Sequence, residues 1–134
     1  MRAVLDPNVV ISGFLSQTGS PAAVLQAWRK GSFEAIVSPL VLAELERALA
    51  YPKLRKRIPS SDADAAVRWL RGGATVVDDP AEQPPVRSED PGDDYLIALA
   101  AHQRAALVSG DRHLLALAAR IPVYSPGDFL HLLR

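Results

Sequence analysis

Short apolar runs alternate along the chain with longer amphipathic segments. The apolar runs lie at residues 2–5, 33–37, 75–77, 107–108 and 123–124. Runs this short, apolar on both faces, are typical of strands in a parallel sheet that helices cover on both sides. The run at 75–77 is short enough to form an edge strand.

The segments between these runs carry helix capping signals. Serine–proline pairs at 20–21, 38–39 and 125–126 each combine an N-cap residue with proline at the first helical position. We predict helices over 21–31, 39–52, 63–71, 90–102, 111–119 and from 126 onward, with Gly72-Gly73 ending the third. Asp6-Pro7-Asn8 reads as a turn that ends the first strand, and residues 78–87, rich in proline and acid, read as a loop.

Strands that alternate with helices in this way predict a three-layer α/β fold. We expect a mostly parallel central sheet of four to five short strands with helices on both faces. At 134 residues the chain fits one domain, residues 1–134.

Composition and charge exclude several classes of protein. The chain contains no cysteine, which removes disulfides, thiolate catalysis and cysteine-type zinc sites. It shows no signal-peptide pattern and no apolar run near the roughly 18 residues that span a bilayer, so we expect a cytoplasmic location. The formal net charge is zero, so a nucleic-acid partner must be held by local basic patches.

Acidic residues stand where apolar segments begin or end. Asp6 closes the first strand and Asp111 follows the fourth, and ligands of parallel sheets bind beyond such carboxyl ends. Glu44 lies on the second predicted helix and the Asp93-Asp94 pair opens an apolar helix. Each acid alone fits a turn or helix-cap role, but four such placements together predict one site.

Spacing alone leaves two choices within this set open. Glu46 shares the helix of Glu44, and periodicity does not decide which carboxylate points inward. Periodicity leaves Asp93 and Asp94 equivalent as well.

A shared acidic site favours a divalent cation, because converging carboxylates raise one another's pKa unless a cation neutralises them. Ligands that are all oxygen suit Mg²⁺ or Mn²⁺. The three histidines, His102, His113 and His131, lie in separate segments and form no zinc spacing.

Four stretches of the chain, 4–12, 38–45, 90–100 and 107–115, resemble the motifs of the PIN-domain nucleases, and within them the VapC-like toxin components of toxin–antitoxin pairs. The resemblance spans nearly the whole chain. One departure is Pro7, where the family more often has threonine, whose hydroxyl can support the metal site.

The resemblance implies a metal-dependent ribonuclease that uses metal-activated water. It selects Glu44 over Glu46 and Asp94 over Asp93, so that the metal ligands would be Asp6, Glu44, Asp94 and Asp111, with Asp93 assisting at the rim. Asn8 and Ser109 would orient ligands and substrate, and Lys53, Arg55, Lys56 and Arg57 would contact the RNA backbone. An antitoxin partner and a homodimer are also implied.

Three other functions compete with this one. A receiver-type phosphoacceptor or an aspartate-nucleophile phosphatase needs a late lysine, and no lysine follows Lys56. A catalytically degenerate PIN domain that only binds RNA or protein remains the alternative, although the acids are intact.

Overall fold

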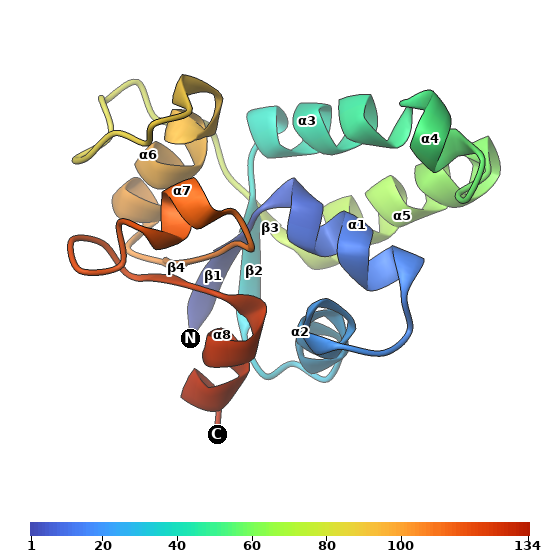
Figure 1. Cartoon of the computed structure of the whole chain (residues 1–134), viewed down its shortest axis with the longest axis horizontal. Coiled ribbons are helices and arrows are strands. Elements are labelled where there is room, and N and C mark those ends of the chain that lie inside the picture. The colour runs from blue at the N-terminus through green and yellow to red at the C-terminus, as the bar shows by residue number, and fades with distance from the viewer.

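The computed structural model describes residues 1–134 and contains a central five-stranded sheet with helices on both sides (Figure 1). The strands are β1 (Arg2–Leu5), β2 (Glu34–Val37), β3 (Thr75–Val76), β4 (Ala106–Val108) and β5 (Val123–Tyr124). Their order is β3-β2-β1-β4-β5, and every neighbouring pair is parallel. The predicted α/β fold is therefore confirmed, and the sheet is parallel throughout, with β3 at an edge.

The helices divide between the two faces of this sheet. They are α1 (Pro7–Leu15), α2 (Ser20–Arg29), α3 (Pro39–Leu49), α4 (Pro52–Arg55), α5 (Ser60–Gly73), the 3₁₀ helix η1 (Pro91–Asp93), α6 (Asp94–Gln103), α7 (Arg112–Leu115) and α8 (Pro126–Leu132). Figure 1 shows α1, α3 and α5 on one side of the sheet and α6 and α7 on the other. None of these helices is both long and apolar enough to cross a membrane.

The strand order changes direction beside the central strand. The chain steps from β1 to β2 and β3 on one side, then returns to place β4 and β5 on the other. Leu5 pairs with Val108, and the Asp6 amide donates to the Val108 carbonyl at 2.9 Å. The residues that follow β1 and β4 therefore emerge side by side, at the place where a parallel sheet binds its ligands.

Close packing of helices on one face depends on two glycines. A Cβ on Gly13 of α1 would lie 2.4 Å from the Leu25 side chain of α2, and one on Gly73 would lie 2.9 Å from the Trp28 ring. Gly73 is therefore a contact residue at the end of α5. The helix predicted over 63–71 begins earlier, at Ser60, and ends within the predicted Gly72-Gly73 pair, at Gly73.

Helix α1 was not predicted, because Asp6-Pro7-Asn8 was interpreted as a turn. Asp6 is in fact the N-cap of α1, its carboxylate accepting from the Asn8 amide, and Pro7 occupies the first turn. The β-branched residues that follow, Val9, Val10 and Ile11, are all buried, so core packing outweighs their modest helix propensity.

Four other helices begin or end away from the predicted positions. The helix predicted over 39–52 ends at Leu49, and a separate short helix, α4, begins at Pro52. Gly19, with a positive φ of 96°, caps α2, so Ser20 is its first residue. The segment predicted as a helix over 90–102 begins with η1, and regular helix starts at Asp94. The helix predicted over 111–119 ends at Leu115, and turns complete the segment.

Candidate active site

Asp6 and Asp111 are joined through a buried serine. Asp6 is only 4% exposed, and its Oδ2 accepts a hydrogen bond from the Ser109 hydroxyl at 2.7 Å. The same Ser109 oxygen accepts from the Asp111 amide at 3.0 Å. Asp111 is the N-cap of α7 and accepts from the His113 amide at 2.8 Å. Ser109 therefore fixes the relative position of the two aspartates that follow β1 and β4.

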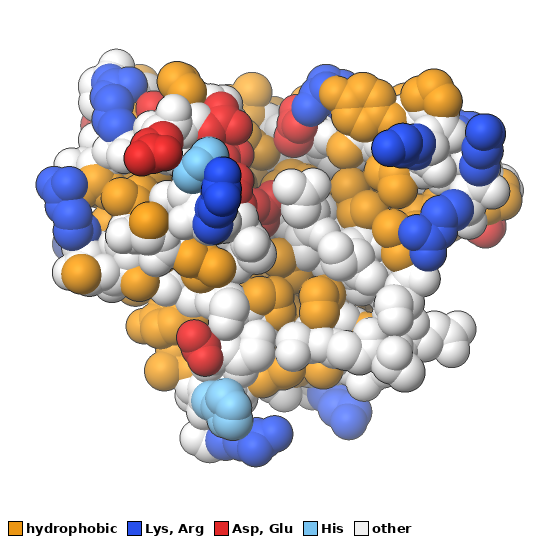
Figure 2. Space-filling view, viewed as in Figure 1, with side chains coloured by type: hydrophobic (Ala, Val, Ile, Leu, Met, Phe, Trp, Pro, Cys, Tyr) orange, Lys and Arg blue, Asp and Glu red, His pale blue; other side chains and the backbone are white.

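A small acidic pocket opens in front of Asp6. It has a volume of about 310 Å³, and its charged and phenolic lining residues are Asp6, Glu44, Arg47, Asp90, Asp93 and Tyr95. Figure 2 shows acidic side chains gathered where α3 faces α6 and α7. The carboxyl end of the sheet thus presents a concave surface dominated by negative charge.

Glu44 lines this pocket and Glu46 does not. Glu46 lies 3.7 Å from Arg71 of α5, at an exposed position on another face of the helix. Glu44 forms a two-pronged ion pair with the guanidinium of Arg47, one turn further along α3, including an Nε to Oε2 bond of 2.8 Å. This hydrogen bond lowers the pKa of Glu44. The carboxylate in the pocket is therefore ionised and already paired with a cation.

The two consecutive aspartates at the start of α6 point to different places. Asp94 accepts from the Ser88 amide at 2.9 Å and lies 3.3 Å from the Arg87 guanidinium, so its carboxylate holds the preceding loop. Asp93 lines the acidic pocket, and its Oδ2 is buried without a hydrogen-bond partner. The structure therefore brings Asp93, and not Asp94, to the other acids.

Electrostatics single out Asp6 and Asp93 among these acids. Burial raises the pKa of Asp6, opposed by its hydrogen bonds from Asn8 and Ser109, and the charges of Asp111 and Glu44 raise it further. Burial raises the pKa of Asp93 to about 7, helped by the neighbouring carboxyl group of Asp111 and by the charges of Asp6 and Asp90. The ionised form of both carboxyl groups is therefore destabilised, and a bound cation would stabilise it.

Tyr95 also responds to this negative field. Burial raises the pKa of its phenol, and the charges of Asp6, Glu44, Asp93 and Asp79 raise it further. At neutral pH the phenol therefore keeps its proton and can donate a hydrogen bond into the pocket.

The pocket offers the oxygen donors that a hard divalent cation prefers, but these side chains are not arranged to coordinate one ion. No three acidic or histidine side chains stand in an arrangement that could hold one ion together. The unpartnered Oδ2 of Asp93 and the raised pKa values of Asp93 and Asp6 fit an oxygen-ligand cation site, because a bound cation would stabilise both carboxylates as anions. Glu44 would have to leave Arg47 to join such a site.

Other predicted site residues lie at varying distances from the pocket. Asn8 lines it, and the Asn8 amide donates to Asp6 Oδ1 at 3.0 Å. Ser109 lies behind Asp6 and supports it. Pro7 offers no hydroxyl, but both oxygens of Asp6 already have donors. The basic residues Lys53, Arg55, Lys56 and Arg57 lie on and just after α4, outside the pocket lining.

Three residues of the pocket were missed from the sequence. Arg47 could have been found, because an acid and a base three positions apart on a helix lie on the same side. Asp90 caps η1 by accepting from the Gly92 amide at 2.9 Å. Tyr95 gave no signal, because a single aromatic residue in an apolar helix usually belongs to the core.

Comparison with known proteins gives a family match over most of the chain. A sequence model described as "PIN domain" matches residues 2–113. None of the curated proteins matches the chain.

Two solved structures have the same fold at low sequence identity. One is a chain of VapBC2 from Rickettsia felis, which was crystallised with a DNA fragment from its promoter; it is 16% identical with a TM-score of 0.63, over 93% of this chain and 98% of that one. The other is a PilT N-terminus domain protein from Sulfolobus solfataricus P2, 16% identical with a TM-score of 0.54, over 99% of this chain and 93% of that one.

Proposed function

Since the chain belongs to the PIN-domain family, we propose that it is a ribonuclease that hydrolyses phosphodiester bonds with the help of Mg²⁺ or Mn²⁺. The observation that carries the proposal is the acidic pocket at the carboxyl ends of β1 and β4, with its buried Asp6 and its unpartnered Asp93 oxygen. Such a pocket repels anions, so it needs a cation before it can accept a phosphate.

The proposed metal ligands are Asp6, Glu44, Asp93 and Asp111. This set differs from the sequence-based set by one residue, because Asp94 is engaged with Ser88 and Arg87. Asp94 takes a positioning role, in which it holds the loop before α6 and thereby orients its neighbour.

The chemistry follows from these donors. A divalent ion bound by carboxylates lowers the pKa of a water molecule and offsets the charge that develops on the phosphate. Ser109 holds Asp6 and Asp111 in register, and Asn8 anchors the other oxygen of Asp6. Arg47 and the protonated Tyr95 phenol line the same pocket and can donate to phosphate oxygens.

A basic surface beside the pocket supports RNA as the substrate. Lys and Arg side chains gather over α4, to the right of the acidic hollow in Figure 2. We propose that Lys53, Arg55, Lys56 and Arg57 contact the RNA backbone, as positively charged side chains do without reading sequence.

We further propose that the protein is the toxin component of a toxin–antitoxin pair. The fold shared with the VapBC2 chain supports this role. If it is correct, expression of the wild type should arrest host growth, and Asp6→Asn should not. A short reading frame beside the gene is the expected source of an antitoxin.

The direct test is cleavage of single-stranded RNA by the purified protein. We expect cleavage with Mg²⁺ or Mn²⁺, none with excess EDTA, and a loss of about a thousandfold or more in Asp6→Asn, because several kcal/mol of metal-assisted stabilisation disappear. Asp128→Asn, an exposed acid of α8, is the matched control and should cleave like wild type. Equal cleavage by wild type and Asp6→Asn would indicate a contaminating ribonuclease and support a degenerate RNA-binding domain.

A further inference from the structure

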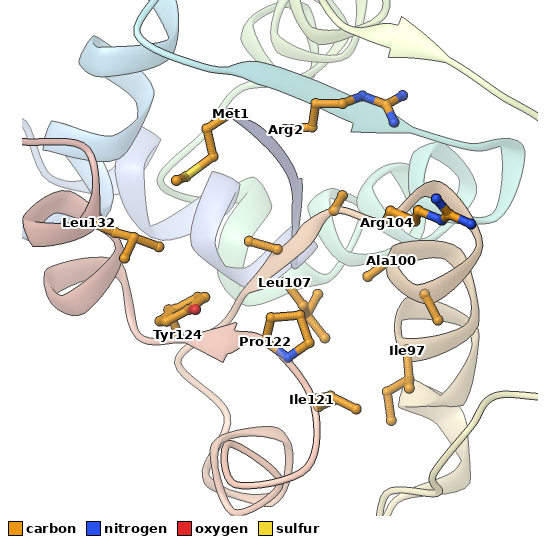
Figure 3. A pocket seen from close by; sticks show the side chains of 13 residues that line it. Met1, Arg2, Ile97, Ala100, Arg104, Leu107, Ile121, Pro122, Tyr124 and Leu132 are labelled. Carbon is orange, nitrogen blue, oxygen red and sulfur yellow. The ribbon is translucent and has the colours of Figure 1, made fainter.

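A second, larger cavity lies at the side of the sheet where β1 and β4 begin, opposite the side that holds the acidic pocket. It has a volume of about 660 Å³ and opens between α6, β4, β5 and α8 (Figure 3). Cavities of roughly 300 to 1,000 Å³ are the size that takes small organic ligands in proteins. The cavity shares no lining residue with the acidic pocket, so nothing in the proposed nuclease reaction uses it.

The walls of this cavity are almost entirely apolar. Ten of its 13 lining residues are hydrophobic, among them Leu107, Ile121 and Leu132. Small residues of α6 and β4, such as Ala101 and Ala106, leave the space open. Leu132 is 42% exposed at its rim, which costs free energy while no apolar group covers it.

Two guanidinium groups stand at one side of the cavity. Figure 3 shows Arg2 and Arg104 across from Leu132 and Tyr124. Arg2 is fully engaged: it donates to the Gln103 carbonyl at 2.7 Å and to the Gln103 side chain at 3.1 Å, and lies 3.6 Å from Glu34. The Arg104 guanidinium has neither a hydrogen bond nor an ion pair. The cavity therefore has an unpaired, solvent-exposed guanidinium beside an apolar surface.

Arg104 also has an unusual backbone. Its φ of 52° and ψ of 45° lie in the left-handed region, and it is the only non-glycine residue of the chain with positive φ. The Arg104 amide donates to the Ala101 carbonyl, and the Ala105 amide donates to the Ala100 carbonyl. A helix that ends with these bonds usually has glycine at the left-handed position. Arginine at this position costs backbone free energy that glycine would not, so its side chain is the feature that needs an explanation.

From these observations we propose that the cavity binds a small organic anion with an apolar body and a carboxylate. The apolar body fills the space between α6 and α8, and the carboxylate pairs with Arg104. The volume and the apolar lining favour a ligand with an apolar body, and the unpaired Arg104 guanidinium favours an anionic head group over a neutral or a cationic one.

Octanoate titrated into ¹⁵N-labelled protein tests the proposal, with octan-1-ol as the uncharged comparison. We expect saturable amide shifts at the cavity, including Ala101 and Leu107, and tighter binding of octanoate than of octan-1-ol. Arg104→Gln and Arg104→Gly should each weaken octanoate about three- to tenfold and leave octan-1-ol unchanged. Arg104→Gly should also melt at the same or a higher temperature, because glycine accepts positive φ without strain.

Two further variants make the result specific. Ala101→Trp, at an exposed lining position, should fill the space and abolish binding of both probes. Arg29→Gln alters a guanidinium at a different hollow, beside Phe14 and Trp69, and should leave octanoate binding unchanged. The proposal is overturned by octanoate shifts centred on Trp69, by an absence of saturable shifts, or by equal octanoate affinity in wild type and both Arg104 variants.

Discussion

The side of the sheet where the parallel strands end differs in chemistry from the side where they begin. We call the first the acidic edge and the second the apolar edge. At the carboxyl ends of β1 and β4, Asp6 and Asp111 cap helices. Asp6 lines the acidic pocket, and Asp111 lies outside its lining but close enough to raise the pKa of Asp6 and Asp93. At the amino ends, Arg2 and Arg104 flank a cavity of apolar side chains. Helices begin at the first edge, where their dipoles favour anions, and α6 ends at the second, where cations are favoured. Chain direction alone thus sorts charge between the two edges.

The edges also differ in how their charges are compensated. Arg2 at the apolar edge is held by Gln103 and Glu34, whereas Asp93 at the acidic edge has an oxygen with no partner. Groups of like charge are packed together only at the acidic edge, which raises the pKa of Asp6 and Asp93. The acidic edge is therefore the less stable of the two when no cation is bound, and experiments on it should show larger effects.

After Asp6, the largest effect is expected from Glu44. Glu44→Gln should lower Mg²⁺-dependent RNA cleavage about a hundredfold or more, because a carboxylate ligand becomes a weakly coordinating amide. Glu46→Gln on the same helix is the control and should cleave at nearly the wild-type rate, since Glu46 faces Arg71. Similar losses in both variants would mean that the substitutions act on α3 as a whole and not on the pocket.

Ser109→Ala should have the next largest effect. The substitution removes the donor to Asp6 Oδ2 and the acceptor for the Asp111 amide. Losing such support for metal ligands typically costs roughly ten- to a hundredfold in metal affinity or activity. Cleavage measured against Mg²⁺ concentration should show the loss. Ser125→Ala, which removes the cap of α8 but no hydrogen bond to Asp6 or Asp111, should leave the Mg²⁺ dependence unchanged, and an equal shift in it would contradict the assigned role of Ser109.

The unfolding free energy should depend on pH through Asp93. Its pKa is about 7 in the folded protein and near 3.8 in an ordinary environment, so between these values the folded state binds more protons. Its contribution to stability is present at low pH and is lost as the pH rises toward 7 and above.

Asp93→Asn should therefore stabilise the metal-free protein at pH 8 more than at pH 5. Because Asp93 is partly exposed and shares charge with Asp111, we expect a gain of about 1–2 kcal/mol at pH 8. Urea unfolding in EDTA measures this difference. An equal effect at both pH values would show that Asp93 titrates normally.

The smallest effect is expected from Arg47. Arg47→Gln frees Glu44 from an exposed ion pair, so the Mg²⁺ concentration for half-maximal cleavage should fall about two- to fivefold. If Arg47 instead binds substrate, its loss should raise KM for RNA without lowering the Mg²⁺ requirement. Kinetics at several Mg²⁺ and RNA concentrations separate the two outcomes.

The acidic edge was largely predictable from the sequence and the apolar edge was not. The apolar run before Asp6, the Ser38-Pro39 pair and the run before Asp111 are local signals, and each corresponds to a strand end or helix start in the structure. The hollow beside Arg104 arises where small residues leave space between elements distant in sequence, and nothing local marks it. The sequence also gives no sign that Arg104 adopts the left-handed backbone conformation, because glycine and asparagine are the residues that usually indicate it.

The choice between Asp93 and Asp94 marks the limit of sequence reasoning within the acidic edge. Adjacent residues at a helix start point about 100° apart, and periodicity does not fix which one faces the sheet edge. The 3₁₀ turn η1 and the Ser88 amide, which binds Asp94, settle the orientation. Both depend on the loop that precedes α6, whose path the sequence did not predict.

Calorimetric titration of Mn²⁺ at pH 8 into wild type, Asp93→Asn and Asp94→Asn tests the central claim most directly. The geometry predicts that Asp93→Asn weakens Mn²⁺ binding by at least about tenfold, because a ligand is lost. Asp94→Asn should stay within about threefold, since asparagine can still accept from the Ser88 amide. Loss of binding in Asp94→Asn together with wild-type affinity in Asp93→Asn would contradict the proposed site.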